Sequence, residues 1–141
     1  MKNRFNLKRL SIVIFLVVNT IIFNSMYAQE TKPVQSDPLF TKSIGTWEGK
    51  LLIDTVKLPL VFKIKKNEQQ KFVVTLDSPA QKGFNIPLGD LSNEAGKLKI
   101  DAPSINGYYI GKFLDASTLD GTWNQNGSTL PLRLIKKKEV K

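Results

Sequence analysis

The sequence predicts an all-β protein, an antiparallel up-and-down meander of about eight strands that forms a small barrel or half-barrel. Three observations predict it. Apolar and polar residues alternate with a period of two through most of the chain after residue 45, which is typical of strands with one buried face. Turn residues separate these runs, and connections this short require antiparallel neighbours. No window has the apolar spacing of an amphipathic helix.

The strand pattern is clearest at 58–65, where Leu60, Phe62 and Ile64 share one face and Lys63 lies on the other. In chain order, the expected strands are 47–53, 58–65, 71–77, 86–91, 97–101, 108–114, 119–124 and 130–134. A flat sheet of these strands would leave its apolar face in water and two edges unpaired, so we expect it to roll up. A sandwich of two sheets is the alternative.

Two sequence features indicate local geometry within the sheet. Asn126-Gly127 is typical of a two-residue hairpin, because a type I′ turn needs positive φ at both central positions. Pro131 lies inside the last expected strand and has no N–H to donate. That position should therefore face an edge or a bulge.

Residues 37–44 are expected to form one helical turn before the first strand. Asp37 would cap the turn and Pro38 would take its first position. Leu39 and Phe40 would then plug one end of the barrel.

The N-terminus has the order of a secretory signal peptide: a basic stretch from Lys2 to Arg9, an apolar run, and a short segment that ends at Ala28. The apolar run of about 14 residues is shorter than the roughly 20 that span a membrane, which favours cleavage over a permanent anchor. We therefore expect an exported bacterial protein, periplasmic or secreted, with no permanent membrane span after cleavage. The expected organisation is a signal peptide at 1–28, a flexible lead at 29–37, a single β-barrel-like domain at 38–136 and a basic tail at 137–141.

Composition excludes several chemistries. The chain has 21 Lys and Arg against 12 Asp and Glu. Much of this excess lies in the two termini, so the body is only mildly basic and we expect no nucleic-acid partner. The sequence has no Cys and no His. Thiolate catalysis, Cys-based zinc sites and a Ser-His-Asp triad are therefore ruled out, and we expect no metal, no cofactor and no catalytic constellation.

The longest irregular stretch inside the domain runs from Asp77 to Gly83. In one interpretation it is a structural turn that Pro79 stiffens. In the other it is a rim loop whose Asp77, Ser78 and Gln81 contact a ligand or partner. Ser78 could serve as a nucleophile only with Asp77 or Lys82 as its base, which we consider a remote alternative.

Aromatic residues on alternating strands must partly face inward, and four are candidates for ligand or partner binding: Trp47, Phe62, Tyr108 and Trp123. They either fill the interior or line a small apolar pocket. The short chain favours a mostly filled interior. An interior cavity of roughly 300 Å3 or more, lined by apolar side chains, would favour ligand binding.

The tripeptide Gly-Thr-Trp occurs twice, at 45–47 and 121–123. We expect Gly45 and Gly121 to be structural, each letting an indole pack closely across it. A Gly-x-Trp at the first strand, after a short helical turn, resembles the lipocalin-like barrels. That resemblance implies that Trp47 packs at the closed end under an Arg from a late strand, and Arg133 is the candidate for this cover.

A closer resemblance covers most of the chain after the signal segment. It is carried by several motifs in order: Gly-Thr-Trp-Glu-Gly-Lys-Leu at 45–51, Leu-Val-Phe-Lys-Ile at 60–64, Asp-Ser-Pro-Ala-Gln at 77–81, Ile-Pro at 86–87, Gly-Thr-Trp-Asn-Gln at 121–125 and Pro-Leu at 131–132. These motifs are similar to the small β domain that precedes the catalytic domain of certain exported bacterial α/β-hydrolases. The nucleophile elbow Gly-x-Ser-x-Gly of those enzymes is absent from this sequence.

The resemblance thus implies a non-catalytic accessory or binding module of the envelope. We expect it to hold a small apolar ligand, or to dock on a hydrolase or another envelope protein. One alternative is a purely structural or interaction domain with a filled interior. The other is a hydrolase that uses no His.

Overall fold

The computed structural model describes residues 37–138, so the expected signal peptide and most of the flexible lead lie outside the described residues. In chain order the elements are the helix α2 (Pro38–Ser43), the strands β1 (Gly45–Ile53), β2 (Val56–Lys66) and β3 (Phe72–Ser78), the 3-10 turn η1 (Pro79–Gln81), the strands β4 (Gly83–Pro87), β5 (Leu91–Glu94) and β6 (Lys97–Ala102), the 3-10 turn η2 (Pro103–Ile105), and the strands β7 (Gly107–Phe113), β8 (Thr118–Gln125) and β9 (Ser128–Lys136). Within this range, no helix has the length and apolar character that crossing a membrane requires.

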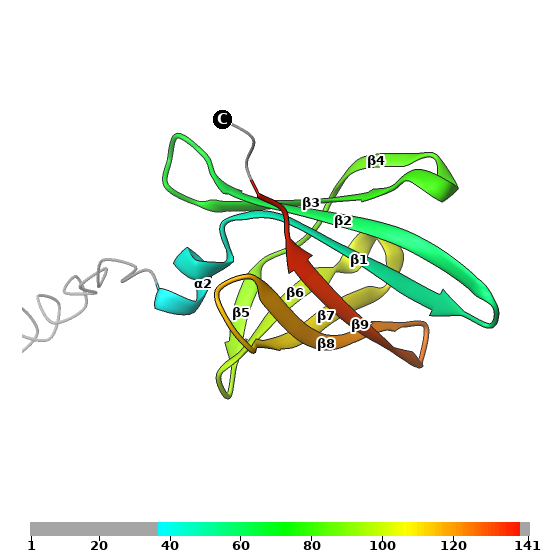
Figure 1. The fold of residues 1–141 in the computed structure, drawn as a ribbon. Coiled ribbons are helices and arrows are strands. Elements are labelled where there is room, and N and C mark those ends of the chain that lie inside the picture. The colour runs from blue at the N-terminus through cyan, green and yellow to red at the C-terminus, as the bar shows by residue number, and fades with distance from the viewer. Residues whose placement is uncertain (1–36, 139–141) are drawn as a thin grey trace, which may run out of the picture. The chain divides into compact units, whose positions relative to one another are not determined.

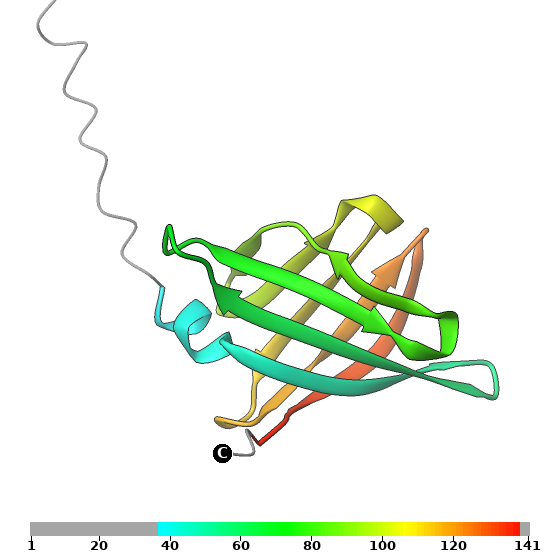
Figure 2. The ribbon, with the colours of Figure 1, turned by 90° about the horizontal axis from the view of Figure 1, so that it is seen from above.

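All nine of these strands belong to one antiparallel sheet with the order β4-β3-β2-β1-β9-β8-β7-β6-β5. The sheet curls into a half-barrel, as Figures 1 and 2 show from two directions. The prediction of an all-β, up-and-down half-barrel is confirmed. All neighbouring strands are consecutive in the chain except β1 and β9, where 47–49 pair with 134–136.

The seam of the half-barrel lies between β4 and β5, which are the two edges of the sheet. The linker between them crosses from β3 to β6: the Leu88 N–H donates to the Val74 carbonyl at 2.9 Å, and the Gly89 N–H donates to the Asp101 carbonyl at 2.7 Å. The single strand that the sequence predicts at 86–91 is therefore wrong. Two short strands lie there, because the chain has to leave one edge and reach the other.

One end of the half-barrel is closed by α2, as the sequence predicts. The Asp37 carboxylate accepts a hydrogen bond from the Leu39 N–H at 2.9 Å, which caps the helix, and Pro38 takes its first position. Leu39 and Phe40 pack against the core. The Phe40 ring lies 5.7 Å from that of Phe72 on β3, so the helix plugs this end of the sheet.

Aromatic side chains fill the middle of the half-barrel. The Phe62 ring lies 5.8 Å from the Tyr109 ring and 6.1 Å from the Trp123 ring. All three side chains are buried, together with aliphatic residues of the inward faces: Leu60, Ile64, Val74, Leu76, Leu98, Ile100, Leu119, Leu132 and Leu134. The period-two alternation of the sequence is thus the alternation between core and solvent.

The local predictions about the last hairpin also hold. Asn126 and Gly127 both have positive φ, 49° and 81°, as a type I′ turn requires. Pro131 pairs with Thr122 of β8 on one side, whereas the pairing of β9 with β1 involves only residues 134–136. The missing N–H therefore interrupts no ladder.

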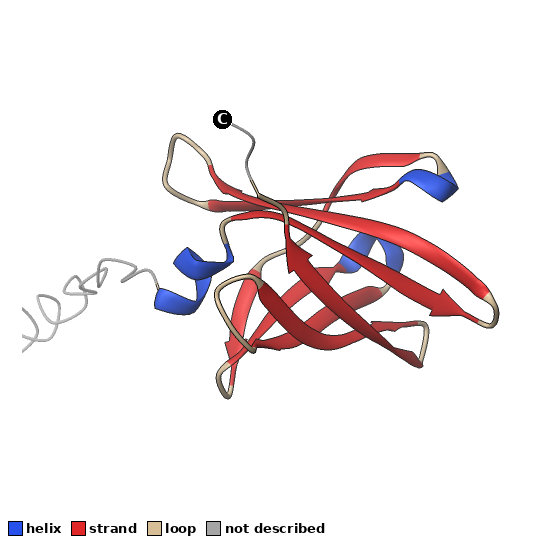
Figure 3. Ribbon diagram, in the orientation of Figure 1, coloured by secondary structure: helices blue, strands red, loops and turns tan. Residues whose placement is uncertain are grey.

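Two corners of the sheet repeat one conformation. In each, a Pro opens a 3-10 turn, a residue with positive φ follows, and a Gly begins the next strand; the positive-φ residues are Lys82 (56°) and Asn106 (51°). Asp-Ser-Pro-Ala-Gln-Lys-Gly at 77–83 thus matches Asp-Ala-Pro-Ser-Ile-Asn-Gly at 101–107. Both turns lie at the end of the half-barrel opposite α2, which we call the open end (Figure 3).

Candidate binding site

A small cleft of about 230 Å3 lies at the open end, between the two corners. Ser78 and Gln81 reach it from the first corner, Ile105 from the second, and Gln125 from the end of β8. Its other lining residues are apolar: Leu51, Ile53, Leu58, Leu60, Leu76, Ile86 and Trp123. The volume is below the roughly 300 Å3 set above for an interior cavity, which agrees with an interior that is mostly filled.

The polar groups of the cleft bond one another. The Ser78 hydroxyl donates to Oε1 of Gln81 at 2.8 Å. The Trp123 indole N–H donates to Oε1 of Gln125 at 3.0 Å, and Nε2 of Gln125 donates to the Ile105 carbonyl at 2.8 Å. Each of these side chains has a partner within the cleft wall, and most of the lining side chains are apolar, so the cleft offers mainly apolar surface to a ligand.

Asp77 points away from the cleft and has a structural role. It lies between Leu76 and Ser78, which face inward, so its own side chain faces outward. Its Oδ2 lies 2.6 Å from Nζ of Lys63, and its Oδ1 accepts from the Asn85 N–H at 2.7 Å. The Lys63 ammonium, followed by the Asn85 N–H, holds the pKa of Asp77 below its ordinary value.

The other predicted binding residues do not gather at the cleft. Phe62 lies behind Trp123 in the packed core. Trp47 lies at the opposite end, where its indole N–H donates to the Ser43 carbonyl at 2.7 Å. Tyr108 is on the outer face of β7. The structure therefore brings together only Ser78, Gln81 and Trp123 from the predicted set.

The expected cover of Trp47 by Arg133 is wrong. Arg133 faces solvent, and its Nε lies 2.9 Å from Oδ1 of Asp120. Lys136 takes the place instead: its Nζ lies 5.3 Å from the Trp47 ring centroid. The reason is that side chains alternate between the two faces of β9: Lys136 lies on the inward face with Leu134, whereas Arg133 lies on the outward face.

Both glycines of the repeated tripeptide lie at crowded positions, where an added Cβ would first meet atoms other than those of an indole. Gly45 has φ +134°, and a Cβ there would lie 2.6 Å from Cε of Lys136. A Cβ on Gly121 would meet the backbone of β7, at Ile110 and Gly111. Gly121 thus lets β7 and β8 approach each other closely.

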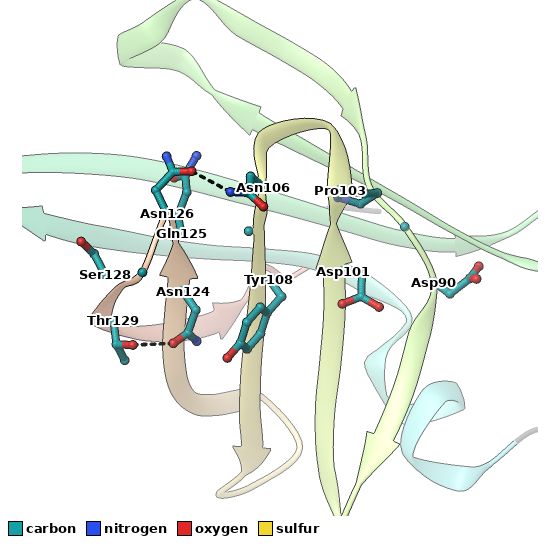
Figure 4. Close-up of a pocket in the computed structure, with 13 residues that line it drawn as sticks. Asp90, Asp101, Pro103, Asn106, Tyr108, Asn124, Gln125, Asn126, Ser128 and Thr129 are labelled. Atoms are coloured by element: carbon teal, nitrogen blue, oxygen red, sulfur yellow. Dashed lines mark hydrogen bonds between the residues drawn. The ribbon is translucent and has the colours of Figure 1, made fainter.

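A larger hollow lies outside the half-barrel, over the outer face of β6, β7 and β8. This outer groove has a volume of about 640 Å3. Figure 4 shows Tyr108 in its middle, between Asp101 and Asn124. Asp90 and Pro103 stand on one side, and the β8–β9 hairpin stands on the other. Most of the residues that line it have polar side chains, in contrast to the cleft.

Sequence reasoning missed Gln125 and Ile105, which build one side of the cleft. The signal for Ile105 was the match between 77–83 and 101–107, which places it in the position of Gln81. No such match indicates Gln125. Across residues 37–138, no three carboxylates lie close enough together to hold a metal ion.

Fold and site define a small half-barrel with an apolar cleft at its open end and a polar groove outside. Comparison of the sequence with protein-family models and with curated proteins gave no match.

Proposed function

We propose that this protein is a non-catalytic binding module whose cleft takes up the end of an apolar chain. The observation that carries the proposal is the apolar lining of the cleft, whose polar groups bond one another. Its volume of about 230 Å3 is smaller than that of sites that enclose a whole ligand, roughly 300–1,000 Å3. The cleft therefore suits one part of a longer molecule.

The remainder of such a ligand has an apolar surface to lie on. Ile53 lines the cleft and is 43% exposed, and its cross-strand partner Val56 is 63% exposed. Apolar surface thus continues from the cleft onto the β1–β2 hairpin. A chain lying along this hairpin would bury both side chains, each contributing favourably to binding.

The contacts of Ser78 support a non-catalytic role. Its hydroxyl donates to the neutral amide of Gln81, and a nucleophilic Ser needs a general base in that place. The neighbouring Asp77 carboxylate is bonded to Lys63 and Asn85 on the other face of the strand. We expect the purified protein not to hydrolyse generic esters; turnover that disappears in Ser78→Ala would instead establish a hydrolase without His.

The two tryptophans provide the test, because Trp123 lines the cleft and Trp47 lies at the opposite end. In a Trp47→Phe variant, a brominated decanoic acid should quench the emission of Trp123 in a saturable way. In a Trp123→Phe variant, the same compound should leave the emission of Trp47 unchanged. Equal quenching of Trp47 and Trp123, or no quenching of either, would contradict binding in the cleft. The alternative of a purely structural or interaction domain would then be favoured.

A matched pair of substitutions sharpens this test. Leu58→Glu places a carboxylate in the cleft, whereas Leu52→Glu makes the same change at a side chain that is 52% exposed and outside it. We expect Leu58→Glu to weaken binding by at least about tenfold, which corresponds to roughly 1.4 kcal/mol. Leu52→Glu should bind like the wild type. Both variants must show the wild-type far-ultraviolet circular dichroism.

The resemblance to the β domain of exported α/β-hydrolases supports an accessory role in the bacterial envelope. In this proposal the protein is periplasmic or secreted, and docks on a hydrolase or another envelope protein or presents its ligand there. N-terminal sequencing of protein from its own cells should begin at Gln29 if the signal segment is cleaved after Ala28. Native mass spectrometry of the same sample should show a bound lipid, and a bare chain would count against a carrier.

A further inference from the structure

Backbone hydrogen bonds hold the outer groove on both sides. On one side the Gly89 N–H donates to the Asp101 carbonyl at 2.7 Å, which holds the β4–β5 linker beside β6. On the other, the Asn126 N–H donates to the Asn106 carbonyl at 3.3 Å and fixes the tip of the β8–β9 hairpin. A site held in this way loses little conformational entropy when a ligand binds.

An exposed aromatic ring lies in the middle of the groove (Figure 4). Tyr108 is 37% exposed, and Nζ of Lys99 lies 5.0 Å from its ring centroid. A Tyr ring offers a flat apolar face and a polar hydroxyl, with few rotatable bonds to immobilise. It can therefore stack against a ligand that presents C–H groups on one face and hydroxyl groups at its edges.

Amide side chains surround this ring. Nδ2 of Asn106 donates to Oδ1 of Asn126 at 3.0 Å, and the Thr129 hydroxyl donates to Oδ1 of Asn124 at 2.6 Å. Nδ2 of Asn124 also donates to Oγ1 of Thr122 at 3.1 Å. These bonds fix the side chains but use only part of their capacity, because each amide carries two N–H donors and an oxygen with two lone pairs. The groove can thus both donate to and accept from hydroxyl groups.

The charge of the groove excludes other ligand classes. Asp90 and Asp101 line it, and none of the lining residues in the described part of the chain is Lys or Arg. Lys99, which lies over Tyr108, pairs with Asp101 at 3.3 Å and with Glu94 at 3.2 Å, so two carboxylates offset its charge. An anionic ligand such as a phosphate would be repelled by the carboxylates. An apolar chain would desolvate the amides without replacing their hydrogen bonds.

We propose that the outer groove binds a neutral oligosaccharide, with one sugar ring stacked on Tyr108 and its hydroxyl groups bonded to Asn106, Asn124 and Asp101. The groove has room for more than one sugar unit, since its volume is about 640 Å3. Asp90 and Asp101 accept hydrogen bonds from sugar hydroxyls without requiring a cation. Gln125 lines both this groove and the cleft, but the groove lies on the outer face of the sheet, and the proposal does not depend on the function proposed for the cleft.

Isothermal titration of the purified protein with chitohexaose, cellohexaose and maltohexaose tests the proposal. At least one of these oligosaccharides should bind. Tyr108→Ala should weaken that binding by about tenfold or more, as expected for a central aromatic contact. Tyr108→Phe keeps the ring and should restore most of the affinity. Asn124→Ala should also weaken binding.

Phe84→Ala is the matched control, since Phe84 is also an exposed aromatic residue, 60% exposed, but lies outside the groove on β4. It should bind like the wild type, and so should the cleft variant Leu58→Glu. Thermal melting must show that each variant is folded. The proposal is overturned if none of the three oligosaccharides binds, if Tyr108→Ala binds as tightly as the wild type, or if Phe84→Ala weakens binding equally.

Discussion

Gln125 ties Trp123 to the second corner of the sheet: its Oε1 accepts from the indole N–H at 3.0 Å, and its Nε2 donates to the Ile105 carbonyl at 2.8 Å. One side chain thus positions two residues that line the cleft. Gln125→Ala would remove both bonds and leave partly buried groups unpaired. We expect a loss of about 1–3 kcal/mol in the free energy of unfolding, measured by urea denaturation.

Gln81→Ala serves as the control for this loss, because Gln81 is exposed and bonds only the Ser78 hydroxyl in the described part of the chain. Gln81→Ala leaves the buried Ser78 hydroxyl without this bond, at a cost of about 1 kcal/mol that should remain smaller than the cost of Gln125→Ala. If the two variants lose equal stability, Gln125 does not have the anchoring role that its geometry indicates.

The Tyr109 hydroxyl is buried and, within residues 37–138, has no hydrogen-bond partner. It lies against Gly111, whose missing side chain makes room for the phenol. Tyr109→Phe should therefore raise the free energy of unfolding at neutral pH by about 1 kcal/mol, since an unsatisfied buried group is costly. The exposed Tyr108→Phe should change it by less than about 0.5 kcal/mol. A destabilised Tyr109→Phe would show that the hydroxyl is satisfied, for example by water.

Tyr109 also predicts an alkaline transition. Burial, aided by the Asp120 charge, raises the pKa of Tyr109 above its ordinary value of 10.0. Above pH 10 the Tyr109 phenol ionises more readily in the unfolded chain than in the folded protein. The part of the folding stability that depends on the neutral phenol is therefore fully present below pH 10 and is lost as the pH rises through the folded-state pKa. Between pH 10 and 12 the wild type should lose stability faster than Tyr109→Phe. Parallel curves in denaturant titrations at each pH would contradict this.

Asp77 predicts a transition at the acid end. Its pKa is lowered by Lys63 and by the Asn85 N–H, so its contribution is present above the unfolded pKa of about 3.9 and is lost as the pH falls through the folded-state value. Asp77→Asn removes the titrating group. The stability difference between wild type and variant should therefore shrink below about pH 4. If the stability difference between wild type and variant stays constant from pH 7 to pH 2, the contribution of Asp77 comes from its bond to the Asn85 N–H alone.

Lys136 and Arg133 can be compared through the same substitution. Lys136→Met keeps the aliphatic stem and removes the charge over Trp47, a contact of about 0.5–1 kcal/mol. Arg133→Met removes an exposed ion pair with Asp120, with an expected cost of about 0–1 kcal/mol. Fluorescence separates the two in a Trp123→Phe background: only Lys136→Met should shift the emission of Trp47. If Arg133→Met shifts the emission of Trp47, the expectation that Arg133 covers Trp47 would be right after all.

Gly121→Ala tests the close approach of β7 and β8. The added Cβ would lie 2.5 Å from Cα of Gly111 and would also meet the Ile110 carbonyl. Backbone cannot move aside cheaply, so we expect a loss of about 3 kcal/mol or more. Gly96→Ala meets nothing within 4 Å, and its positive φ alone should cost about 1–2 kcal/mol. Melting temperatures of both variants check the order.

The sequence predicted what depends on neighbouring residues. The strand positions other than 86–91, the Asp37 cap and the Asn126-Gly127 turn each follow from a local rule, and the structure contains them. The alternation of side chains along a strand would also have shown that Arg133 cannot cover Trp47. Leu134 faces inward, so its immediate neighbour Arg133 must face outward. Here the alternation was a better guide than the likeness to the lipocalin-like barrels.

The cleft could not be predicted in the same way, since its residues come from β1, β2, β3, β4, β8 and both corners. Only the curl of the sheet brings Gln81 near Ile105. The alternation also gives no answer at Tyr108 and Tyr109, because two aromatic residues are adjacent and either could face the core. The pairing of 109 with Trp123 decides it, and that pairing is a long-range contact.

The β1–β9 pairing has a consequence for how the protein is made. Read around the sheet, the strands run without interruption from β5 to β9 and on through β1 to β4, so the fold is a circularly permuted meander. Of the nine described strands, β1 is synthesised first and its second partner, β9, is synthesised last. Until 134–136 emerge, the nascent sheet keeps an additional open edge at Trp47 and Gly49. Closure is therefore a late, long-range step, and such steps are the slow ones in folding.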